Sequence, residues 1–526
     1  MIRVRQIKIE VDKDDLDLLK QKVISKLRIN KTDIISFKIN KKSIDARRKD
    51  FIYYVYEVDL ELVNEDKVLL RNKSNDIIKI EKEEYKINVT GTKKLNSRII
   101  IVGSGPAGLF SAYILANLGY KPLIIERGEK IEDRVKTVEK LFNEGILNKN
   151  SNVQFGEGGA GTFSDGKLNT LVKDKFNRCK KVYEIFVENG APEEILYLNK
   201  SHIGTDLLRN VIINMRNKII SKGGEFRYNT TLTNLIIKNK QLEKIEVNHN
   251  ELIDCEILIL AIGHSARDTF KMLHENNLIM NPKPFAVGVR ILHPQEMINN
   301  NQYGTKYKLP PADYKLTYNT KEKRGVYSFC MCPGGYVVNA SSEEGFLAIN
   351  GMSNHKRDSV TSNSAIVVTV NPNDYGTSIL DGINFQRKLE KKAYKLGNGK
   401  IPVQLYNDYK SNKISTRFGE VKPIFKGDYT FANINEIFPD YINKSLKEAI
   451  DYYDTKIKGF ARSDAIIAGV ESRTSSPIRI ERDENFNSNI TGIYPIGEGA
   501  GYAGGITTSA IDGLKVCEKI TEKYFC

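Results

Sequence analysis

The sequence predicts an α/β fold in which a parallel sheet, a small antiparallel sheet and helices are stacked in layers. Three stretches of the 526-residue chain support this prediction. They are a strand, glycine loop and helix at 98–126, a run of short strands from 223 to 267, and a strand, glycine loop and helix at 492–520. The 40% hydrophobic and 28% charged residues are close to the values of ordinary globular proteins.

The first 95 residues are predicted to form a separate βαββ unit of the ferredoxin-like type. Strand-like runs at 2–11, 34–44 and 51–62 surround a helix-like run at 14–28. This segment holds 23 Lys or Arg against 17 Asp or Glu, within a chain of net charge +15. Lysines and acids alternate over most of the chain, which indicates a solvated surface. We therefore expect a docking or dimerisation module; RNA binding is the alternative, although no aromatic–glycine RNA signature is present.

The stretch at 98–126 has the arrangement of a dinucleotide-binding unit. "RIIIVG" is a buried strand, and Gly103, Gly105 and Gly108 give the G-x-G-x-x-G spacing. Pro106 suits the first helical position, and Glu126 ends the next strand, where it would accept hydrogen bonds from ribose hydroxyls. The residues predicted to contact the dinucleotide here are Gly103, Ser104, Gly105, Pro106, Ala107, Gly108, Glu126, Arg127 and Arg134.

The same stretch has no charge between Arg98 and Lys121, a length that could span a bilayer. The glycines and proline of "GSGPAG" divide it into a strand-like half and a helix-like half. No membrane span is therefore expected.

A second glycine-rich loop follows at 154–169, "QFGEGGAGTFSDGKLN". Its backbone amides and small side chains suit close contact with a planar or phosphorylated ligand. The alternative is an ordinary surface loop, but Gln154, Phe155 and Phe163 among the glycines argue against it. The predicted ligand contacts are Gly158, Gly159, Ala160, Gly161, Thr162, Ser164, Asp165, Gly166 and Lys167.

Two further segments favour FAD over NAD. The strands at 223–267 form a small meander that returns to a buried strand ending near Gly263. At 492–520 a strand ends in Gly-Glu and leads to a helix whose positive N-terminus would face a flavin. The predicted contacts are Gly263, Gly497, Glu498, Gly504, Gly505 and Ile506. The fold class is therefore α/β, with a Rossmann-like FAD-binding domain of three-layer ββα type.

These motifs, together with four other segments, resemble a known family. The segments are 43–62, 328–340 ("SFCMCPGGYVVNA"), 350–359 ("NGMSNHKRDS") and 469–480 ("GVESRTSSPIRI"). The chain resembles the FAD-dependent dehydrogenases labelled NAD(FAD)-utilising. The resemblance implies a flavoprotein oxidoreductase with an N-terminal α/β domain, and it implies no particular substrate.

Four domain segments are predicted: 1–95, the N-terminal α+β domain; 96–285, the first part of the FAD-binding domain; 286–460, an inserted α+β substrate domain; and 461–526, the last part of the FAD-binding domain. A second G-x-G-x-x-G for NAD(P)H and a C-x₄-C pair near the first helix are both absent from the sequence. Either NAD(P)H binds transiently as an electron donor, or the electrons come from the substrate or from a partner.

The catalytic residues are not fixed by the sequence. Cys330 and Cys332 are too close for a relaxed disulfide and are read first as small core thiols, with a thiolate near the flavin or soft metal ligation as the alternative. Arg357 and Arg473 could face an anionic substrate or pair with an acid, and His264 could approach the cofactor. No metal site is predicted.

The function predicted is hydride transfer between flavin N5 and an unidentified small organic substrate. Two alternatives stay open: an FAD-dependent RNA-modifying protein, and a flavin-binding redox sensor without turnover. Six scattered cysteines and a start without an apolar signal region indicate a cytoplasmic protein. A nucleic-acid partner and a membrane are not expected, and the oligomeric state is left open.

Overall fold

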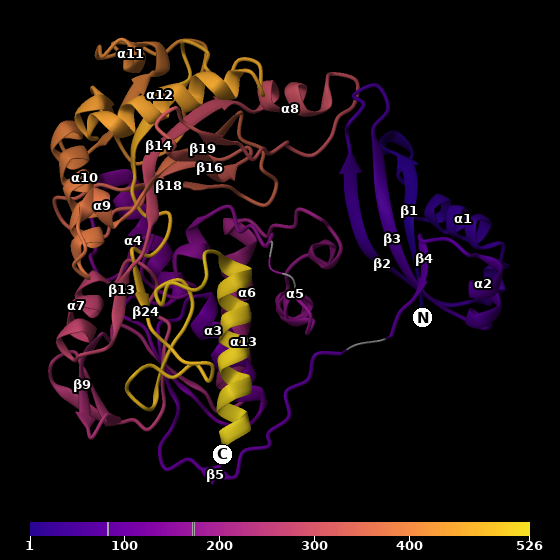
Figure 1. The fold of residues 1–526 in the computed structure, drawn as a ribbon, viewed down its shortest axis with the longest axis horizontal. Coiled ribbons are helices and arrows are strands. Elements are labelled where there is room, and N and C mark those ends of the chain that lie inside the picture. The colour runs from indigo at the N-terminus through magenta and orange to yellow at the C-terminus, as the bar shows by residue number, and fades with distance from the viewer. Residues whose placement is uncertain (82–83, 171, 173) are drawn as a thin grey trace.

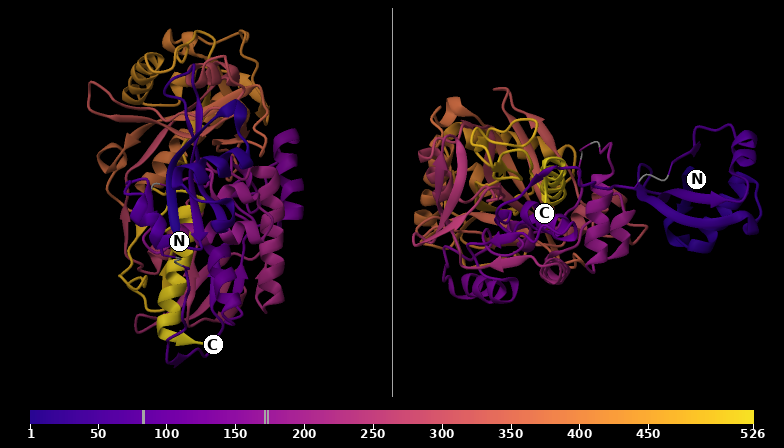
Figure 2. Two further views of the ribbon diagram at one scale, coloured as in Figure 1. Left: turned by 90° about the vertical axis from the view of Figure 1, so that its right-hand side faces the viewer. Right: turned by 90° about the horizontal axis from the view of Figure 1, so that it is seen from below.

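The computed structural model describes residues 1–526 except 82, 83, 171 and 173. A small N-terminal unit, indigo in Figure 1, lies to one side of a larger body, and the view from below in Figure 2 shows the same separation. In the body, a five-stranded and a seven-stranded sheet form the two largest sheets.

The N-terminal unit is a four-stranded antiparallel sheet in the order β2-β3-β1-β4. Its elements follow one another as β1 (Ile2–Glu10), α1 (Leu16–Leu27), β2 (Ile34–Asp45), β3 (Tyr53–Leu62), α2 (Glu65–Arg71) and β4 (Ile77–Lys79). This element and strand order is that of the ferredoxin-like split βαβ motif. Asp15 caps α1 by accepting from the backbone N–H groups of Asp17 and Leu18. The unit meets the body through Lys42, whose N–H donates to the Tyr197 carbonyl at 2.7 Å.

The first large sheet of the body is parallel, in the order β25-β12-β6-β7-β8. Its strands are β6 (Ile100–Val102), β7 (Leu123–Ile125), β8 (Glu225–Arg227), β12 (Leu258–Leu260) and β25 (Ile493–Pro495). Except for β8 (Glu225-Phe226-Arg227) at the edge of the sheet, these short strands are apolar and buried because both faces of the sheet are covered.

Helices pack on one face of this sheet and a meander packs on the other. The helices are α3 (Pro106–Asn117), α5 (Arg178–Glu188), α6 (Thr205–Ser221) and α13 (Ile506–Lys523). The meander is β9 (Leu232–Lys238), β10 (Gln241–Val247) and β11 (Glu251–Asp254), followed by α7 (Arg267–Glu275). This is the predicted three-layer ββα arrangement. The uncharged run at 98–121 forms β6 and α3, and no helix in the described part of the chain is long and apolar enough to cross a membrane.

The second large sheet has the order β15-β16-β19-β14-β23-β20-β22. Its strands are β14 (Phe285–Pro294), β15 (Thr317–Asn319), β16 (Gly325–Cys332), β19 (Thr361–Val370), β20 (Ile401–Leu405), β22 (Tyr429–Phe431) and β23 (Ile466–Glu471). Helices that pack against it are α8 (Gln295–Tyr303), α9 (Pro372–Tyr375), α10 (Asp381–Gly397), α11 (Tyr406–Lys410) and α12 (Asp440–Asp454). Figure 1 shows this sheet and its helices above the parallel layers.

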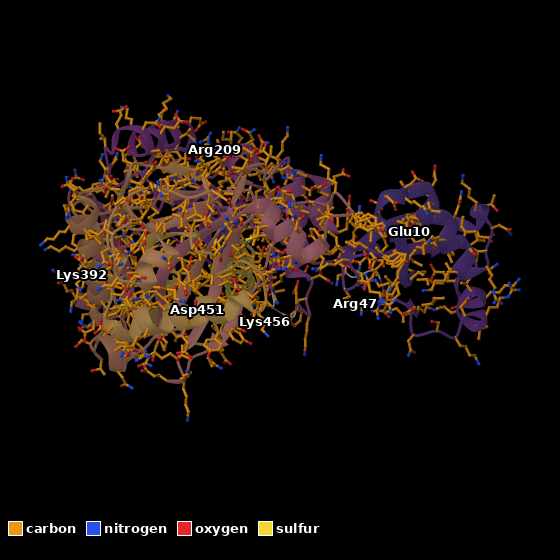
Figure 3. All side chains as sticks on the ribbon, turned by 90° about the horizontal axis from the view of Figure 1, so that it is seen from above. Glu10, Arg47, Arg209, Lys392, Asp451 and Lys456 are labelled. Atoms are coloured by element: carbon orange, nitrogen blue, oxygen red, sulfur yellow. The ribbon has the colours of Figure 1, made fainter. Side chains whose placement is uncertain are left out.

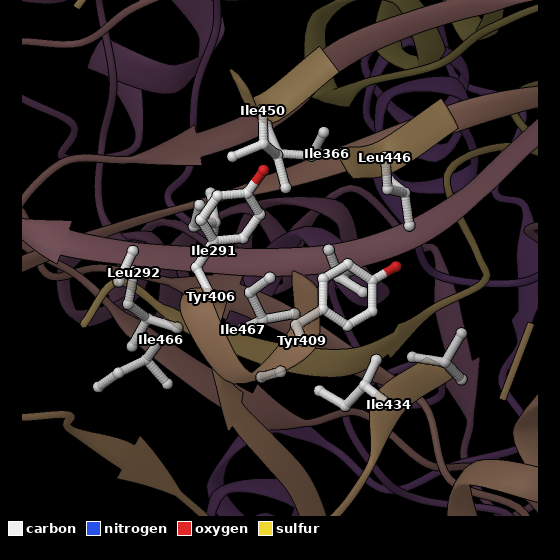
Figure 4. Packing of buried hydrophobic residues seen from close by; sticks show 14 of the residues in the cluster. Ile291, Leu292, Ile366, Tyr406, Tyr409, Ile434, Leu446, Ile450, Ile466 and Ile467 are labelled. Atoms are coloured by element: carbon white, nitrogen blue, oxygen red, sulfur yellow. The ribbon is translucent and has the colours of Figure 1, made fainter. Parts of the chain in front are cut away.

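Isoleucine, leucine and tyrosine side chains fill the space between this sheet and its helices, as the close view in Figure 4 shows. In β14 the buried apolar residues Val289 and Ile291 alternate with Arg290, which therefore points to the opposite face of the sheet. β23 lies beyond residue 460, the predicted end of the insertion, yet it pairs with β14 and β20. The sheet of the insertion thus extends past that boundary.

The remaining elements are short or peripheral. They are β17 (Tyr336–Asn339), β18 (Ile349–Met352) and β21 (Phe425–Lys426) in one small sheet, the pairs β13 (Met280–Pro282) with β24 (Ile478–Ile480) and β5 (Lys93–Lys94) with β26 (Tyr524–Phe525), helix α4 (Ile131–Glu144), and the 3₁₀ turns η1 (Val11–Lys13), η2 (Lys31–Asp33), η3 (Ala160–Phe163), η4 (Glu193–Leu196) and η5 (Ile434–Glu436). Charged side chains of both signs, such as Arg47, Lys392 and Asp451 in Figure 3, lie over the outer surface.

Candidate cofactor and substrate site

A cavity of about 400 Å³ lies between the parallel layers and the seven-stranded sheet. We call its lining from the parallel layers and their loops the floor. Its lining from the second sheet, from β18 of the small neighbouring sheet and from the segment after β23 is called the roof. The floor includes Gly103, Gly105, Pro106, Ala107, Gly159, Gly161, Gly263, Gly497, Gly504 and Gly505. The roof consists of Phe329, Cys330, Asn350, Glu471, Arg473 and Thr474.

The first glycine loop joins β6 to α3 by close backbone contacts. Gly103 has φ +98°, and a Cβ there would lie 2.3 Å from the Ala261 carbonyl oxygen. A Cβ on Gly108 would lie 1.9 Å from the carbonyl oxygen of Gly103. Gly105 is the N-cap of α3 and makes no side-chain cap hydrogen bond. The loop therefore leaves the backbone at the start of α3 open to the cavity.

Glu126 ends β7 and holds this loop in place. One carboxylate oxygen accepts from the N–H and hydroxyl of Ser104, at 2.9 and 2.7 Å. The other accepts from the N–H groups of Gly128 and Gly156, at 3.0 and 3.1 Å. Glu126 lines the cavity, but the chain itself supplies four donors to it. Its observed contacts tie the two glycine loops together.

Arg134 supports the second glycine loop from behind. Its side chain is completely buried, and its guanidinium donates to the carbonyls of Asn152, Val153, Gly156, Glu157 and Gly159 at 2.6–3.2 Å. These bonds give hydrogen-bond partners to loop carbonyls that would otherwise be buried without them. Arg134 thus positions the loop and does not face the cavity.

The C-terminal part of the floor ends at the start of α13. Gly504 and Gly505 line the cavity, and a Cβ on Gly504 would meet no atom within 4 Å. Gly505 is the N-cap of α13 and has no side-chain cap hydrogen bond. Burial raises the pKa of the neighbouring Glu498 to about 7, partly offset by the charge of Lys283. Within the described residues, no donor is hydrogen-bonded to the Glu498 carboxylate.

A buried ion pair anchors the second glycine loop to the roof. Asp165 accepts from Nε of Arg357 at 3.0 Å and from the Ser353 hydroxyl. Burial alone would raise the pKa of Asp165, but Arg357 and Lys167 hold it below its ordinary value. The Lys167 ammonium also donates to the Met331 carbonyl, next to Cys330. Arg357 is therefore committed to Asp165 and lies outside the lining.

Arg473 combines a cavity contact with a buried charge cluster. Its Nε and Nη2 donate to the carboxylate of Glu390 at 3.0 Å each, and Arg267 donates to the same carboxylate at 2.7 and 2.9 Å. Burial alone would raise the pKa of Glu390, but the two guanidinium groups hold it well below its usual range. Nη1 of Arg473 donates to Ser265 and Ser342. The cluster therefore links Arg473 of the roof to Ser265 and Arg267, which follow β12.

Most residues predicted from the sequence come together at this cavity. Seven lie behind the lining: Ser104, Gly108, Arg134, Gly158, Thr162, Cys332 and Arg357. The other predicted cofactor contacts line it: Gly103, Gly105, Pro106, Ala107, Glu126, Arg127, Gly159, Ala160, Gly161, Ser164, Asp165, Gly166, Lys167, Gly263, Gly497, Glu498, Gly504, Gly505 and Ile506. Of the catalytic candidates, Cys330 and Arg473 line it as well.

Several lining residues escaped the sequence reasoning, above all Glu471. It follows the apolar run "IIAGV" in a strand whose six residues are all buried. An acid at the end of such a strand is a usable signal, since a carboxylate is rarely buried without a partner. His264, which the sequence already indicated as able to approach the cofactor, lines the cavity too; burial and the charges of Arg473 and Arg267 lower its pKa to about 3. It is therefore neutral at physiological pH.

Family models match three parts of the chain. Residues 284–474, which contribute nearly all of the roof, match the model described as FAD-dependent protein, C-terminal domain-like. Residues 101–152 match an NAD(P)-binding Rossmann-like domain, and residues 1–61 match a domain of unknown function. No group of three or more His, Cys, Asp or Glu that could hold a metal is found in the described residues.

One known protein is similar in sequence to this chain over nearly its whole length. An uncharacterized protein of Clostridium beijerinckii is 50% identical over 531 residues, 99% of each chain. An L-amino-acid oxidase of Crotalus adamanteus is 44% identical over 43 residues, 8% of each chain. Among solved structures, a glycine oxidase from Bacillus cereus has a TM-score of 0.35 at 11% identity, over 80% of this chain and 93% of its own. That TM-score is too low to carry an argument.

The glycine-lined cavity and the family models define the class: a FAD-dependent protein with a Rossmann-like dinucleotide-binding domain. Within this class, the chain belongs to the same family as the Clostridium beijerinckii relative, because the two sequences are 50% identical over 99% of each chain.

Proposed function

We propose that the protein transfers a hydride between FAD and a small organic substrate held under the roof. FAD, when bound, supplies a ring system that accepts or donates a hydride at N5. The residues described below bind and orient it, and the roof provides the groups that face the substrate.

The observation that carries this proposal is that two helices begin at one cavity. α3 and α13 start at Gly105 and Gly505, both residues line the cavity, and neither helix has a side-chain cap. An uncapped helix N-terminus presents free N–H groups and a positive dipole to negative charge. We assign the α3 end, with Gly103 and Ala107, to the pyrophosphate, and the α13 end to the flavin.

The residues around the cavity fit the cofactor in size and chemistry. The contacts proposed from the sequence include glycines at 159, 161, 263, 497 and 504, all of which line the cavity. Side chains at these positions would narrow the space that a dinucleotide needs. Of the two charged roof residues, Arg473 is committed to Glu390, Ser265 and Ser342, whereas Glu471 keeps one carboxylate oxygen without a hydrogen bond from the described residues. We assign Glu471 to the substrate.

An anaerobic absorbance titration of the purified protein with NADH and then NADPH tests the proposal. We expect flavin bands in the resting spectrum, and loss of the 450 nm band on addition of a reductant. Bleaching by a nicotinamide would make it a donor. If neither bleaches the flavin, small alcohols and amines are tested in turn.

A folded sample that binds no FAD would contradict the proposal. A flavin that no donor reduces would favour the redox-sensor alternative, and copurifying RNA with salt-sensitive affinity would favour RNA modification. We also place the enzyme in the cytoplasm, because all six cysteines are free thiols.

A further inference from the structure

Cys330 is turned into the cavity by an irregularity in its strand. β16 pairs with β19, and the pairing register shifts between Phe329 and Cys332. Cys330 lies in this bulge with φ +44°, whereas extended strand residues have negative φ. As a result Cys330 lines the cavity and Cys332, two residues on, is buried. A bulge that redirects one side chain is typical of functional sites.

Glu471 faces the same space from β23. Its side chain is only 4% exposed, and one oxygen, Oε2, accepts from Nε of Arg290 at 2.7 Å. The other oxygen, Oε1, accepts no hydrogen bond from any residue that the structure describes. Because Glu471 lines the cavity, we infer that this oxygen is directed to whatever the cavity holds.

Arg290 joins the two groups. It is completely buried, and besides Glu471 it donates from Nη1 to the carbonyl oxygen of Cys330 at 3.2 Å and to Asn363 at 2.6 Å. Its Nη2 donates to Asn350 at 2.9 Å. With four partners fixed, the guanidinium holds the Cys330 backbone and the Glu471 carboxylate in one rigid frame.

The charges around this frame favour a thiolate. The Cys332 thiol donates to the carbonyl oxygen of Cys330 at 3.4 Å. Cys332, Arg290 and Lys167 together lower the pKa of Cys330 against the opposing effects of burial and Asp165. Burial raises the pKa of Glu471 to about 7; Arg290 opposes this shift and Cys330 adds to it. Glu498, on the floor, lines the same cavity, and the charge of Cys330 adds to the rise in the Glu498 pKa. The surroundings therefore shift the two pKa values in opposite directions: the Cys330 thiol ionises more readily, and the Glu471 carboxyl less readily, than each does in solution.

We propose that Cys330 and Glu471 are a catalytic acid–base pair that takes the proton a substrate releases together with its hydride. The proposal rests on the proposed function, since it assigns residues to the same substrate pocket. It commits the substrate to a class, an alcohol or amine of the form R₂CH–XH, where X is oxygen or nitrogen.

The proton balance of the oxidation is complete. When the carbon–hydrogen bond breaks, its hydrogen would leave with both electrons as a hydride, which oxidised FAD held by the floor would accept. The X–H bond breaks with its electrons staying on X, a C=X double bond forms, and the proton goes to Sγ of Cys330 or Oε1 of Glu471. The pair thus holds one proton more after the reaction, and it returns this proton to solvent or, in the reverse direction, to the product.

The test is the pH dependence of alkylation of Cys330 in the FAD-containing protein. Iodoacetamide is added at pH 5 to 9, and the modified peptides are quantified by mass spectrometry. Cys526, which is exposed, serves as the reference thiol in the same sample. The Cys526 rate should fall about 200-fold from pH 9 to pH 6, as for an ordinary thiol. The Cys330 rate should fall less than about 5-fold.

Two variants separate the members of the pair. In the wild type, ionisation of Glu471 near pH 7 should change the rate of Cys330 alkylation. Glu471→Gln removes this ionisable group, so the change in rate near pH 7 should disappear. Cys332→Ala removes the neighbouring thiol, so the pH profile of Cys330 alkylation should move to higher pH. The alkylation rate at pH 6 should then be at least about tenfold lower than in the wild type. Cys526 should keep its profile in both variants.

An ordinary thiol profile for Cys330, no modification at any pH, or an unchanged profile in Glu471→Gln would each overturn the proposal. These results do not depend on turnover. The proposed function can fail in the flavin titration while the Cys330 thiolate persists, and the thiolate can be absent while the flavin is reduced normally.

Discussion

The floor and the roof of the cavity are built from different parts of the polypeptide. The floor is mainly backbone: Gly103, Gly105, Gly504 and Gly505 bring main-chain atoms to the surface, and two helices begin there. The roof is mainly side chain, with Cys330, Glu471 and Arg473 supported by buried arginines. A backbone surface is sensitive to added volume, whereas a charged surface is sensitive to a lost partner.

This difference suits a division of labour. Main-chain donors recognise a phosphate or a ring edge without titrating, so the glycine loops of the floor can hold their ligand over a wide range of pH; Glu498 is the floor residue with a raised pKa. The roof contains groups whose pKa values are shifted, among them Cys330 and Glu471. Shifted groups gathered in a cavity are typical of sites that move protons. The two halves can therefore be disturbed separately.

The largest effect should come from adding a methyl group to the floor at Gly108. In Gly108→Ala the new Cβ would lie 1.9 Å from the Gly103 carbonyl oxygen, a backbone atom that cannot move without displacing the loop. We expect a loss of about 3 kcal/mol or more in the free energy of unfolding and protein without bound flavin. Urea denaturation and the ratio of flavin absorbance to protein measure the two effects.

Gly504→Ala is the matched control, because its Cβ would meet no protein atom within 4 Å. It should fold with wild-type stability in the absence of FAD and bind FAD more weakly if the cofactor lies against it. Equal stability of Gly108→Ala and wild type would show that the floor is not held by backbone packing.

The next effect should come from the buried charge cluster behind the roof, at Glu390. Glu390→Gln leaves Arg267 and Arg473 buried without a full counter-charge, and we expect a loss of about 3 kcal/mol in the free energy of unfolding. Glu343→Gln is the control, since Glu343 is 23% exposed and its loss should cost about 1 kcal/mol. Urea denaturation of both variants decides. Equal losses would mean that burial does not set the strength of this cluster.

The sequence was informative about the floor because the floor is made of local patterns. The strand, loop and helix around Gly103 occupy 98–126, and each glycine role follows from the spacing. The C-terminal glycines were likewise predicted to face the ligand, and they line the cavity. The stacking of the layers then follows from the apolar strands, which need cover on both faces.

The roof could not be derived in this way because its contacts join distant segments. Arg290 and Glu471 are 181 residues apart, and nothing in either segment names the other. Arg134 shows the same limit within the floor: the sequence offers an arginine near a cofactor, but the path of the 152–159 loop decides that it binds carbonyls. β23 extends the second sheet beyond the predicted boundary at 460 for the same reason, because strand pairing is not a local property.

A smaller effect, on pH dependence, should separate Glu498 from the rest of the floor. Its pKa is raised from 4.5 to about 7, so the folded state favours the protonated carboxyl. The associated stability is fully present below about pH 4.5 and is lost as the pH rises through about 7. In FAD-free protein, Glu498→Gln should remove a decline of at most about 3 kcal/mol between pH 4.5 and 8.

Urea denaturation at a series of pH values measures this decline, and Glu344→Gln, at an exposed carboxylate, should leave it unchanged. A decline of the same size in Glu498→Gln and in wild type would assign the pH dependence to other groups, such as Glu471 on the roof.

The smallest effect should come from an ion pair at the rim of the floor. Arg127 pairs with Asp268 at 2.9 Å, but the Asp268 side chain is 63% exposed. In Asp268→Asn, Arg127 keeps its hydrogen bond to Thr269 and its position over the Phe155 ring, 4.5 Å from the centroid. We expect a change below about 1 kcal/mol in the free energy of unfolding, since exposed pairs are screened by solvent. Asp268→Asn and Glu390→Gln both replace a carboxylate by an amide. Comparing the two losses in the free energy of unfolding therefore tests the effect of burial directly. If both substitutions cost several kcal/mol, the floor depends on side-chain charge as much as the roof does, and the contrast between the two surfaces fails.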